Sequence, residues 1–251
     1  MRWLQRWLRP NPEPPPDLSP PAIIIGDIHG RADLLDHLLA LIAAEPGAND
    51  ARLIFVGDYI DRGPDSAAVL VRLQGLTAAG KAVCLMGNHE RMLLDAIDRP
   101  EEAGPRWLLN GGDATLASLG AGGRLPGESE AERMAALAGR LREALPPGIE
   151  AWLRALPLWW QDQGLAVVHA GADPALAMVD QTEASLIWGH RRFGQPRADG
   201  LWIAHGHVVM AEPRVKAGRI AVDTGAWSTG RLTAAWIGGG VAAGQVRFFT
   251  T

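Results

Sequence analysis

Three short polar segments of the sequence carry the side chains best suited to chemistry. They read GDIHG from Gly26 to Gly30, GDYIDRGPDS from Gly57 to Ser66, and GNHE from Gly87 to Glu90. Asp27 and Asp58 are 31 residues apart, and Asp58 and Asn88 are 30 residues apart. Each interval has room for one helix and one strand. We therefore expect the three segments at the same end of one sheet, where ligand-binding crevices form in α/β folds.

The residue types in these segments are those of a metal site. Asp27 and His29 are separated by one residue, so both can face one ion from a single extended loop end. Later histidines, His169 in VVHAG and His205 and His207 in AHGHVVM, also follow apolar runs. A mixed oxygen and nitrogen set suits manganese, iron or zinc rather than calcium. Six such ligands around one bridging carboxylate suffice for two ions, a pair that clamps a phosphoryl group at a separation of roughly 3.5–4 Å.

The elements that must position these residues alternate along the chain. Apolar runs that predict strands are Ala22–Ile25, Leu53–Val56, Ala82–Met86, Leu165–Val168 and Leu201–Ala204. Segments with helical periodicity follow the first three, at Arg31–Ala44, Pro64–Ala79 and Glu90–Ile97. Further strands are expected at Ile220–Val222, Leu232–Ile237 and Val246–Phe249, as a closing meander in a mixed arrangement. This pattern is typical of layered α/β architecture.

Two regions stand apart from this alternation. Between residues 104 and 157 the pattern turns helical, with helices expected at Arg106–Leu119, Ser129–Leu145 and Ile149–Leu156, as in a lid or cap. Residues 1–21 form an arm, because seven prolines lie between Pro10 and Pro21. Before them, residues 1–9 place tryptophan and leucine at helical spacing among arginines. That segment is either a weak anchor for a membrane surface or partner, or an arm packed on the domain of residues 22–251.

The composition excludes several classes of protein. The 251 residues are 47% hydrophobic and 21% charged, unlike a disordered or collagen-like chain. No run approaches the ~18 apolar residues of a spanning helix. A formal net charge of −4 gives no general attraction for nucleic acid, so we expect no nucleic-acid partner. The single cysteine, Cys84, is expected to be buried, and the first ten residues lack a signal peptide's apolar region, so we expect a cytoplasmic protein.

Taken in order, the motifs GDIHG, GDYIDRG, GNHE, HAG and GH resemble one branch of a known family. They are similar to the phosphoprotein phosphatase branch of the calcineurin-like metallophosphoesterases, and most of all to its compact bacterial and bacteriophage lambda type. WLLNGGDATLASLG from Trp107 and AVDTGA from Ala221 also resemble that branch. The resemblance implies an α/β metallophosphatase-type four-layer αββα sandwich, with two mixed β-sheets and a helical cap insertion.

The resemblance also implies a role for each matching residue. Asp27 and His29 would bind the first metal, Asp58 would bridge both, and Asn88, His169 and His207 would bind the second. The two divalent ions would be manganese, with iron or zinc as alternatives. His205 would be a rim residue, because the family's ligand follows the glycine of its Gly–His pair. Asp223 matches a position near the last metal histidine, although a strand-ending turn explains it equally well.

Catalytic roles follow from the same motifs. His89 would be the general acid, Asp61 would fix its tautomer, and Arg62 would bind phosphate oxygens beside Asn88. Glu90 would support the loop rather than react. The lambda type has a second phosphate-binding arginine after a tryptophan; here His190 takes that position, and Arg191 or Arg192 is the alternative.

The resemblance implies hydrolysis of a phosphate monoester by a metal-bridging hydroxide. The substrate expected first is a protein phosphorylated on serine or threonine. Related proteins that share these loops hydrolyse diadenosine tetraphosphate, so that small phosphoester is the alternative. A metal-binding scaffold without catalysis is a third hypothesis, which the complete set of ligands, acid and arginine disfavours.

Overall fold

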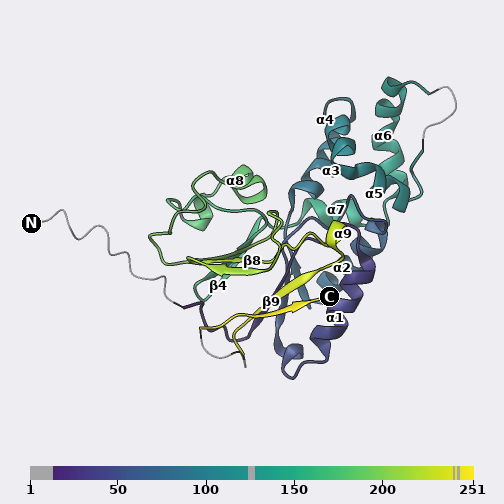
Figure 1. Cartoon of the computed structure of the whole chain (residues 1–251). Coiled ribbons are helices and arrows are strands. Elements are labelled where there is room, and N and C mark those ends of the chain that lie inside the picture. The colour runs from purple at the N-terminus through teal and green to yellow at the C-terminus, as the bar shows by residue number, and fades with distance from the viewer. Residues whose placement is uncertain (1–13, 124–127, 240, 242–243) are drawn as a thin grey trace, which may run out of the picture.

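The computed structural model describes residues 14–123, 128–239, 241 and 244–251 (Figure 1). Its first sheet has the strand order β10-β9-β1-β2-β3. Strands β1 (Ala22–Ile25), β2 (Arg52–Phe55) and β3 (Ala82–Cys84) are parallel, while β9 (Thr233–Ile237) runs antiparallel to β1 and β10 (Arg247–Thr250) antiparallel to β9. The carboxyl ends of the three parallel strands therefore share one edge.

The second sheet has the order β4-β5-β6-β8-β7. Strands β5 (Leu165–Val168), β6 (Trp202–His205) and β8 (Arg219–Ala221) are parallel, whereas β4 (Trp159–Asp162) and β7 (Arg214–Lys216) pair antiparallel at its two edges. Both sheets are mixed, as expected.

Helices cover the outer faces of the sheets (Figure 1). Figure 1 shows α1 and α2 beside the first sheet, α8 above the second, and α4, α5 and α6 grouped beyond the sheets at the upper right. The helices are α1 (Ala32–Ala43), α2 (Ser66–Ala78), α3 (Asn88–Asp98), α4 (Pro100–Trp107), the π-helical turn η2 (Leu108–Gly112), α5 (Asp113–Ser118), α6 (Glu130–Ala144), α7 (Ile149–Arg154), α8 (Glu183–Trp188) and α9 (Ala226–Thr229). Short 3₁₀ turns lie at Ala48–Asp50 and Met178–Asp180.

Alternate residues of β1 face two different cores. Ile24 packs between the sheets with Val167 and Ile220 of the second sheet. Ile23 and Ile25 belong instead to the core on the helical side. Since successive strand side chains point to opposite faces, a wholly apolar strand means burial on both faces. Each fully buried isoleucine contributes roughly 1.5–3 kcal/mol, and the two cores together hold the sheets in register.

The expected elements are largely confirmed, with two corrections. Ile220–Val222 does not form a meander with the last two strands, because β8 lies in the second sheet while β9 and β10 form a hairpin in the first. The single helix expected at Arg106–Leu119 is three pieces, since Gly111 has φ +106 and breaks the helical path. Strands β4 and β7, helices α8 and α9, and the part of α4 before Arg106 were not expected from the sequence.

The proline-rich segment packs on the body where the structure describes it. Leu18 is buried in the core between the sheets, and Pro16 approaches Gly164. The predicted helix of residues 1–9 lies outside the described residues, and the boundary between residues 21 and 22 stays a prediction. Within the described ranges, no helix has both the length and the apolar character needed to cross a membrane.

Candidate metal centre and active site

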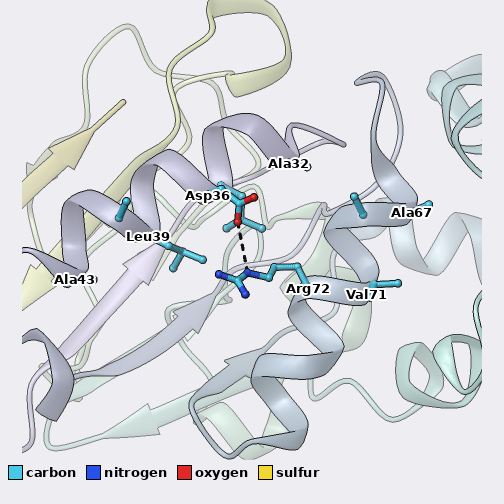
Figure 2. Close-up of a pocket in the computed structure, with 10 residues that line it drawn as sticks. Ala32, Asp36, Leu39, Ala43, Ala67, Val71 and Arg72 are labelled. Carbon is cyan, nitrogen blue, oxygen red and sulfur yellow. Dashed lines mark ion pairs between the residues drawn. The ribbon is translucent and has the colours of Figure 1, made fainter.

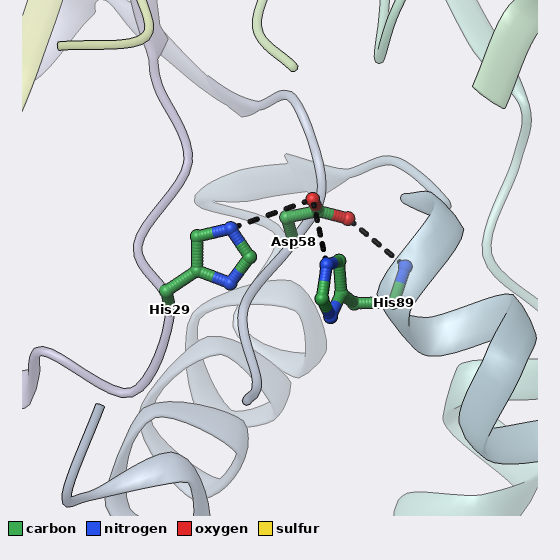
Figure 3. A group of neighbouring side chains, drawn as sticks. All are labelled: His29, Asp58 and His89. Carbon is green, nitrogen blue, oxygen red and sulfur yellow. Dashed lines mark hydrogen bonds and ion pairs between the residues drawn. The ribbon is translucent and has the colours of Figure 1, made fainter. Parts of the chain in front are cut away.

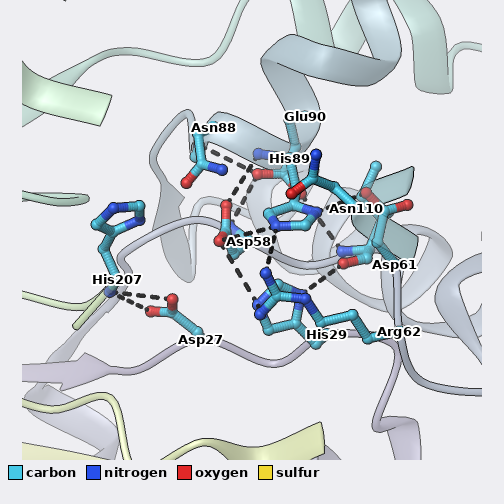
Figure 4. Close-up of polar contacts among 12 residues, drawn as sticks. Asp27, His29, Asp58, Asp61, Arg62, Asn88, His89, Glu90, Asn110 and His207 are labelled. Atoms are coloured by element: carbon cyan, nitrogen blue, oxygen red, sulfur yellow. Dashed lines mark hydrogen bonds and ion pairs between the residues drawn. The ribbon is translucent and has the colours of Figure 1, made fainter. Parts of the chain in front are cut away.

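The six predicted metal ligands, with Asp61, Arg62 and His89, come together from five strand ends. The loops after β1, β2 and β3 supply the GDIHG, GDYIDRG and GNHE side chains, and the loops after β5 and β6 supply His169 and His207. Figure 4 shows Asp58 at the middle of this group, with His29, His89 and Asn88 around it and Asp27 and His207 to one side. The two sheets thus bring their polar ends together.

Backbone conformation marks the same place. Seven non-glycine residues with left-handed φ are recorded among the described residues, and five of them carry predicted site side chains: His29, Asp58, Asp61, Arg62 and His207. Left-handed backbone costs a non-glycine residue energy and persists where surrounding contacts enforce it, as at active sites. The loops are therefore held in uncommon shapes that aim their side chains inward.

The first potential metal group consists of His29, Asp58 and His89 (Figure 3). Nε2 of His29 lies 3.5 Å from Oδ2 of Asp58, and Nε2 of His89 lies 3.8 Å from the same oxygen. Nδ1 of His29 bonds the carbonyl oxygen of Ile60 at 2.8 Å. Because a carbonyl only accepts, the ring proton of His29 is on Nδ1, and Nε2 presents a lone pair to the site.

The second group consists of Asp58, His169 and His207. Nδ1 of His169 donates to the carbonyl of Val56 at 3.1 Å, so its Nε2 also carries a lone pair. That Nε2 lies 2.9 Å from Oδ1 of Asn88, 3.2 Å from Nδ1 of His207 and 3.4 Å from Oδ1 of Asp58. Electron-rich atoms converge here, an arrangement that fits a divalent cation among them. Asp58 belongs to both groups through its two oxygens, as a bridging ligand would.

The lowered pKa values of His29 and His169 agree with a role as metal ligands. Burial lowers the pKa of His29 to about 3 and that of His169 to about 4, although the charge of Asp58 opposes it. Both rings are therefore neutral at physiological pH, and neutral imidazole is the form that binds metals.

Buried carboxylates repel one another at this site. Burial, followed by the charges of Asp223 and Asp58, holds the pKa of Asp27 well above its usual range. Burial, followed by the charge of Asp58, raises the pKa of Glu90 to about 8. Such crowding is relieved when divalent cations neutralise the carboxylates.

Asp27 lies at the site but outside both three-residue groups. Its two oxygens accept the backbone N–H of His207 at 3.2 and 3.0 Å. A Cβ on Gly206 would lie 1.9 Å from Oδ1 of Asp27, so only glycine permits this approach. Asp223 stands nearby, with Oδ1 accepting the N–H of Gly225 at 2.8 Å. Ligation by Asp27 stays a prediction.

His89 and Asp61 form a buried pair. Nδ1 of His89 lies 2.6 Å from Oδ2 of Asp61. Burial lowers the pKa of His89, but the charges of Asp58 and Asp61 outweigh it and raise that pKa above its ordinary value. The ring therefore donates from Nδ1 to the carboxylate, and its Nε2 faces the metal groups.

Arg62 reaches into the same space (Figure 4). Its guanidinium nitrogens lie 3.1 Å from Nε2 of His29 and 3.0 Å from Nε2 of His89. Its Cζ also lies 5.3 Å from the ring centre of Trp227, a cation–π distance. Arg62 thus places a positive charge beside His29 and His89.

Glu90 ties the second loop to the third. Its carboxylate accepts the backbone N–H groups of Asp58 and Tyr59 at 2.8 Å and that of Gly87 at 3.1 Å. The supporting role expected of Glu90 agrees with this geometry.

The segment of residues 190–192, expected to hold the second phosphate contact, is recorded, within the described part of the chain, in contact with Asp173 and not with either metal group. Nε2 of His190 lies 3.6 Å from Asp173, and Arg192 donates to Asp173 at 2.6 Å. Arg191 is exposed. His205 packs its ring against Phe193 and bonds the carbonyl of Gly206, outside both groups.

Sequence reasoning missed several residues around the site. Trp107 and Thr115 donate to Asp61, and Arg106 stacks on Trp188 at 4.5 Å, with the Trp188 ring 6.4 Å from that of His207. No local signal in the sequence pairs Trp107 and Thr115 with Asp61, because these contacts span 46 and 54 residues.

A separate groove lies away from the site. It lies between α1 and α2, encloses about 930 Å³, and is bridged by an ion pair of 3.5 Å between Asp36 and Arg72 (Figure 2). Its lining contains none of the predicted site residues.

Comparison with known proteins supports the same conclusion as the geometry. The family model for calcineurin-like phosphoesterases matches residues 20–211. The chain belongs to the calcineurin-like phosphoesterases. It is 32% identical over 224 residues to serine/threonine-protein phosphatase 1 of Salmonella typhimurium, covering 85% of this chain and 90% of that protein.

Other relatives carry a different name. A bis(5'-nucleosyl)-tetraphosphatase PrpE of Halalkalibacterium halodurans is 28% identical over 236 residues, covering 84% of this chain and 87% of that protein. The crystal structure of a proposed diadenosine tetraphosphatase covers 94% of this chain and 95% of its own, with a TM-score of 0.63 and 22% identity. That similarity supports the fold.

Membership of this calcineurin-like family establishes the general activity. The protein is a hydrolase that acts on phosphoesters, and its histidine and aspartate groups indicate divalent metals. The two mixed sheets with outer helices are those of the expected sandwich.

Proposed function

We propose that this protein is a phosphoprotein phosphatase that hydrolyses phosphoserine and phosphothreonine, with a pair of manganese ions. Asp27, His29, Asp58, Asn88, His169 and His207 would hold the two ions. When bound, such ions supply an activated water and positive charge beside the phosphoryl group.

The chain's own residues would perform the remaining steps. The guanidinium of Arg62 would bind phosphate oxygens, for which its planar fork is suited. His89 would donate a proton from Nε2 to the departing oxygen. Asp61 would hold the ring in position by accepting from Nδ1, at the 2.6 Å separation described above.

The observation that carries the choice of substrate is an apolar site entrance. Four of the ten large apolar side chains recorded as exposed in the described residues lie near site residues in sequence or space: Trp188, Val208, Val209 and Trp227. Val208 and Val209 follow His207, while Trp227 lies beneath Arg62. A clustered apolar surface is typical of a binding site for apolar groups.

Two arginines near this entrance are already neutralised by carboxylates, although Arg106 on Trp188 is recorded in no ion pair with a described residue. A dinucleoside tetraphosphate has four linked phosphates, which need several cations. Arg91, just after the third loop, pairs with Glu183 at 2.6 Å, and Arg192 pairs with Asp173. A phosphopeptide carries one phosphate and can flank it with apolar side chains, so it matches both the charge and the surface.

Direct competition between substrates tests the proposal. With manganese present, we expect kcat/KM for a phosphothreonine peptide to exceed that for diadenosine tetraphosphate by at least about tenfold. Asp58→Asn, prepared in parallel, controls for a contaminating phosphatase. A preference for the tetraphosphate would contradict the proposal, and bound metal without turnover of any phosphoester would favour the scaffold hypothesis.

A further inference from the structure

The Asp61 carboxylate is held by the cap segment, which we define as α4, η2 and α5 (residues 100–118). Nε1–H of Trp107 donates to both carboxylate oxygens, at 3.1 and 3.0 Å. The Thr115 hydroxyl donates to Oδ1 at 2.6 Å. Asp61, Trp107 and Thr115 are all fully buried, with 0% exposure, so water does not compete for these bonds.

The cap segment also holds the backbone of the same loop. Oγ1 of Thr115 accepts the N–H of Asp61 at 2.9 Å, and the carbonyl of Gly111 accepts the N–H of Arg62 at 3.2 Å. Asp61 and Arg62 have φ of 71° and 69°, which neither residue adopts without support. A Cβ on Gly111 would lie 2.9 Å from the backbone nitrogen of Arg62, so glycine permits the contact.

We propose that Trp107 and Thr115 are positioning residues for proton donation: they fix the Asp61 carboxylate, which in turn orients His89. The inference rests on the proposed function, because it takes His89 as the general acid. Without these donors, the carboxylate can rotate away from Nδ1 of His89. Nε2 of His89 then loses its aim at the departing oxygen, and small misplacements of such groups cost up to about 100-fold in rate.

Leaving-group chemistry separates this role from simple loss of structure. A serine alkoxide leaves only with a proton, whereas p-nitrophenolate leaves readily without one. A defect in proton donation therefore slows hydrolysis of a phosphoserine peptide much more than hydrolysis of p-nitrophenyl phosphate. A general loss of structure or of metal slows both substrates alike.

The experiment measures kcat for both substrates, with metal content, in His89→Ala, Trp107→Phe, Thr115→Val and Thr115→Ser. We expect Trp107→Phe and Thr115→Val to lower kcat on the phosphoserine peptide by about 10–100-fold, and on p-nitrophenyl phosphate by no more than about threefold. Thr115→Ser keeps the hydroxyl and should restore most of the peptide activity.

Trp236→Phe is the matched control. Trp236, in β9, is also buried and also donates from Nε1, but to the carbonyl of Gly238 just after that strand. Trp236→Phe removes the same indole N–H and the same side-chain volume as Trp107→Phe, but at a position away from the site. Both substrates should therefore be hydrolysed as in the unmodified protein.

The outcomes separate the two hypotheses. If His89→Ala slows both substrates equally, the acid assignment in the proposed function is wrong. If His89→Ala is selective but Trp107→Phe and Thr115→Val slow both substrates equally, or neither, the positioning role is overturned. Thr115→Val and Thr115→Ser decide the question alone should Trp107→Phe fail to fold.

Discussion

Three of the site histidines differ in the partner of their Nδ1 atom. The rings of His29 and His169 give Nδ1 to a backbone carbonyl and Nε2 to the metal groups, whereas His89 gives Nδ1 to Asp61. A carboxylate partner raises the basicity of an imidazole, so the contact with Asp61 agrees with a ring that takes up and gives a proton. We therefore propose His89 as the proton donor, although it also belongs to the first potential metal group.

Removing the acid should affect chemistry without emptying the site. We expect His89→Ala to lower kcat on a phosphopeptide by roughly 10²–10⁴-fold, the usual contribution of general acid catalysis. Metal content, measured by elemental analysis, should match that of the unmodified protein. Unchanged turnover would refute the acid assignment.

The single cysteine provides a test of the core. Burial raises the pKa of Cys84 to about 12, so at pH 8 the thiol keeps its proton and is a poor nucleophile. We expect a chromogenic disulfide reagent to label one thiol per chain promptly in denaturant and far more slowly in the native protein. Equal rates in the two conditions would contradict the burial of this strand.

At the scale of elements, the loops after β1 and β6 depend on a close contact between the Asp27 side chain and the backbone at Gly206. Gly206 lies against the Asp27 carboxylate with no room for a Cβ, whereas a Cβ on Gly139, inside α6, would meet no atom within 4 Å. We therefore expect replacement by alanine to disturb the structure at Gly206 and to be tolerated at Gly139.

Gly206→Ala should displace Asp27 and weaken manganese binding by about 10–100-fold, as loss of a supporting contact does in metal sites. Gly139→Ala should leave binding unchanged and stabilise the protein by roughly 0.5–1 kcal/mol, because alanine is the better helix former. Calorimetric titration and thermal unfolding measure both effects. Tight manganese binding by Gly206→Ala would show that Asp27 is not a ligand.

The sequence predicted these elements where the signal was local. Strands β1 and β5 were predicted with their observed bounds, since both are apolar throughout and end at polar motifs. Helix α8 and strand β7 were not, because one is six residues long and the other is three exposed residues. The break at Gly111 was also missed: its left-handed backbone is needed for contact with Arg62, which the local pattern does not contain.

At the scale of the whole molecule, the site exists because the two sheets meet. Asp58 comes from the first sheet and His169 and His207 from the second, and the core between the sheets fixes their separation. The motifs named these residues in advance because each lies at a strand end. The donors to Asp61 could not be named, since the contact between Trp107 and Asp61 spans 46 residues and depends on how the cap segment folds back.

The count of bound metal ions tests the central claim most directly. After loading with manganese and removal of free metal, we expect elemental analysis to find two ions per chain, and Asp58→Asn to lose both because Asp58 belongs to both groups. Asp36→Asn, at the surface pair with Arg72, should keep two. One ion or none in the unmodified protein, or two ions in Asp58→Asn, would contradict a dinuclear centre bridged by Asp58.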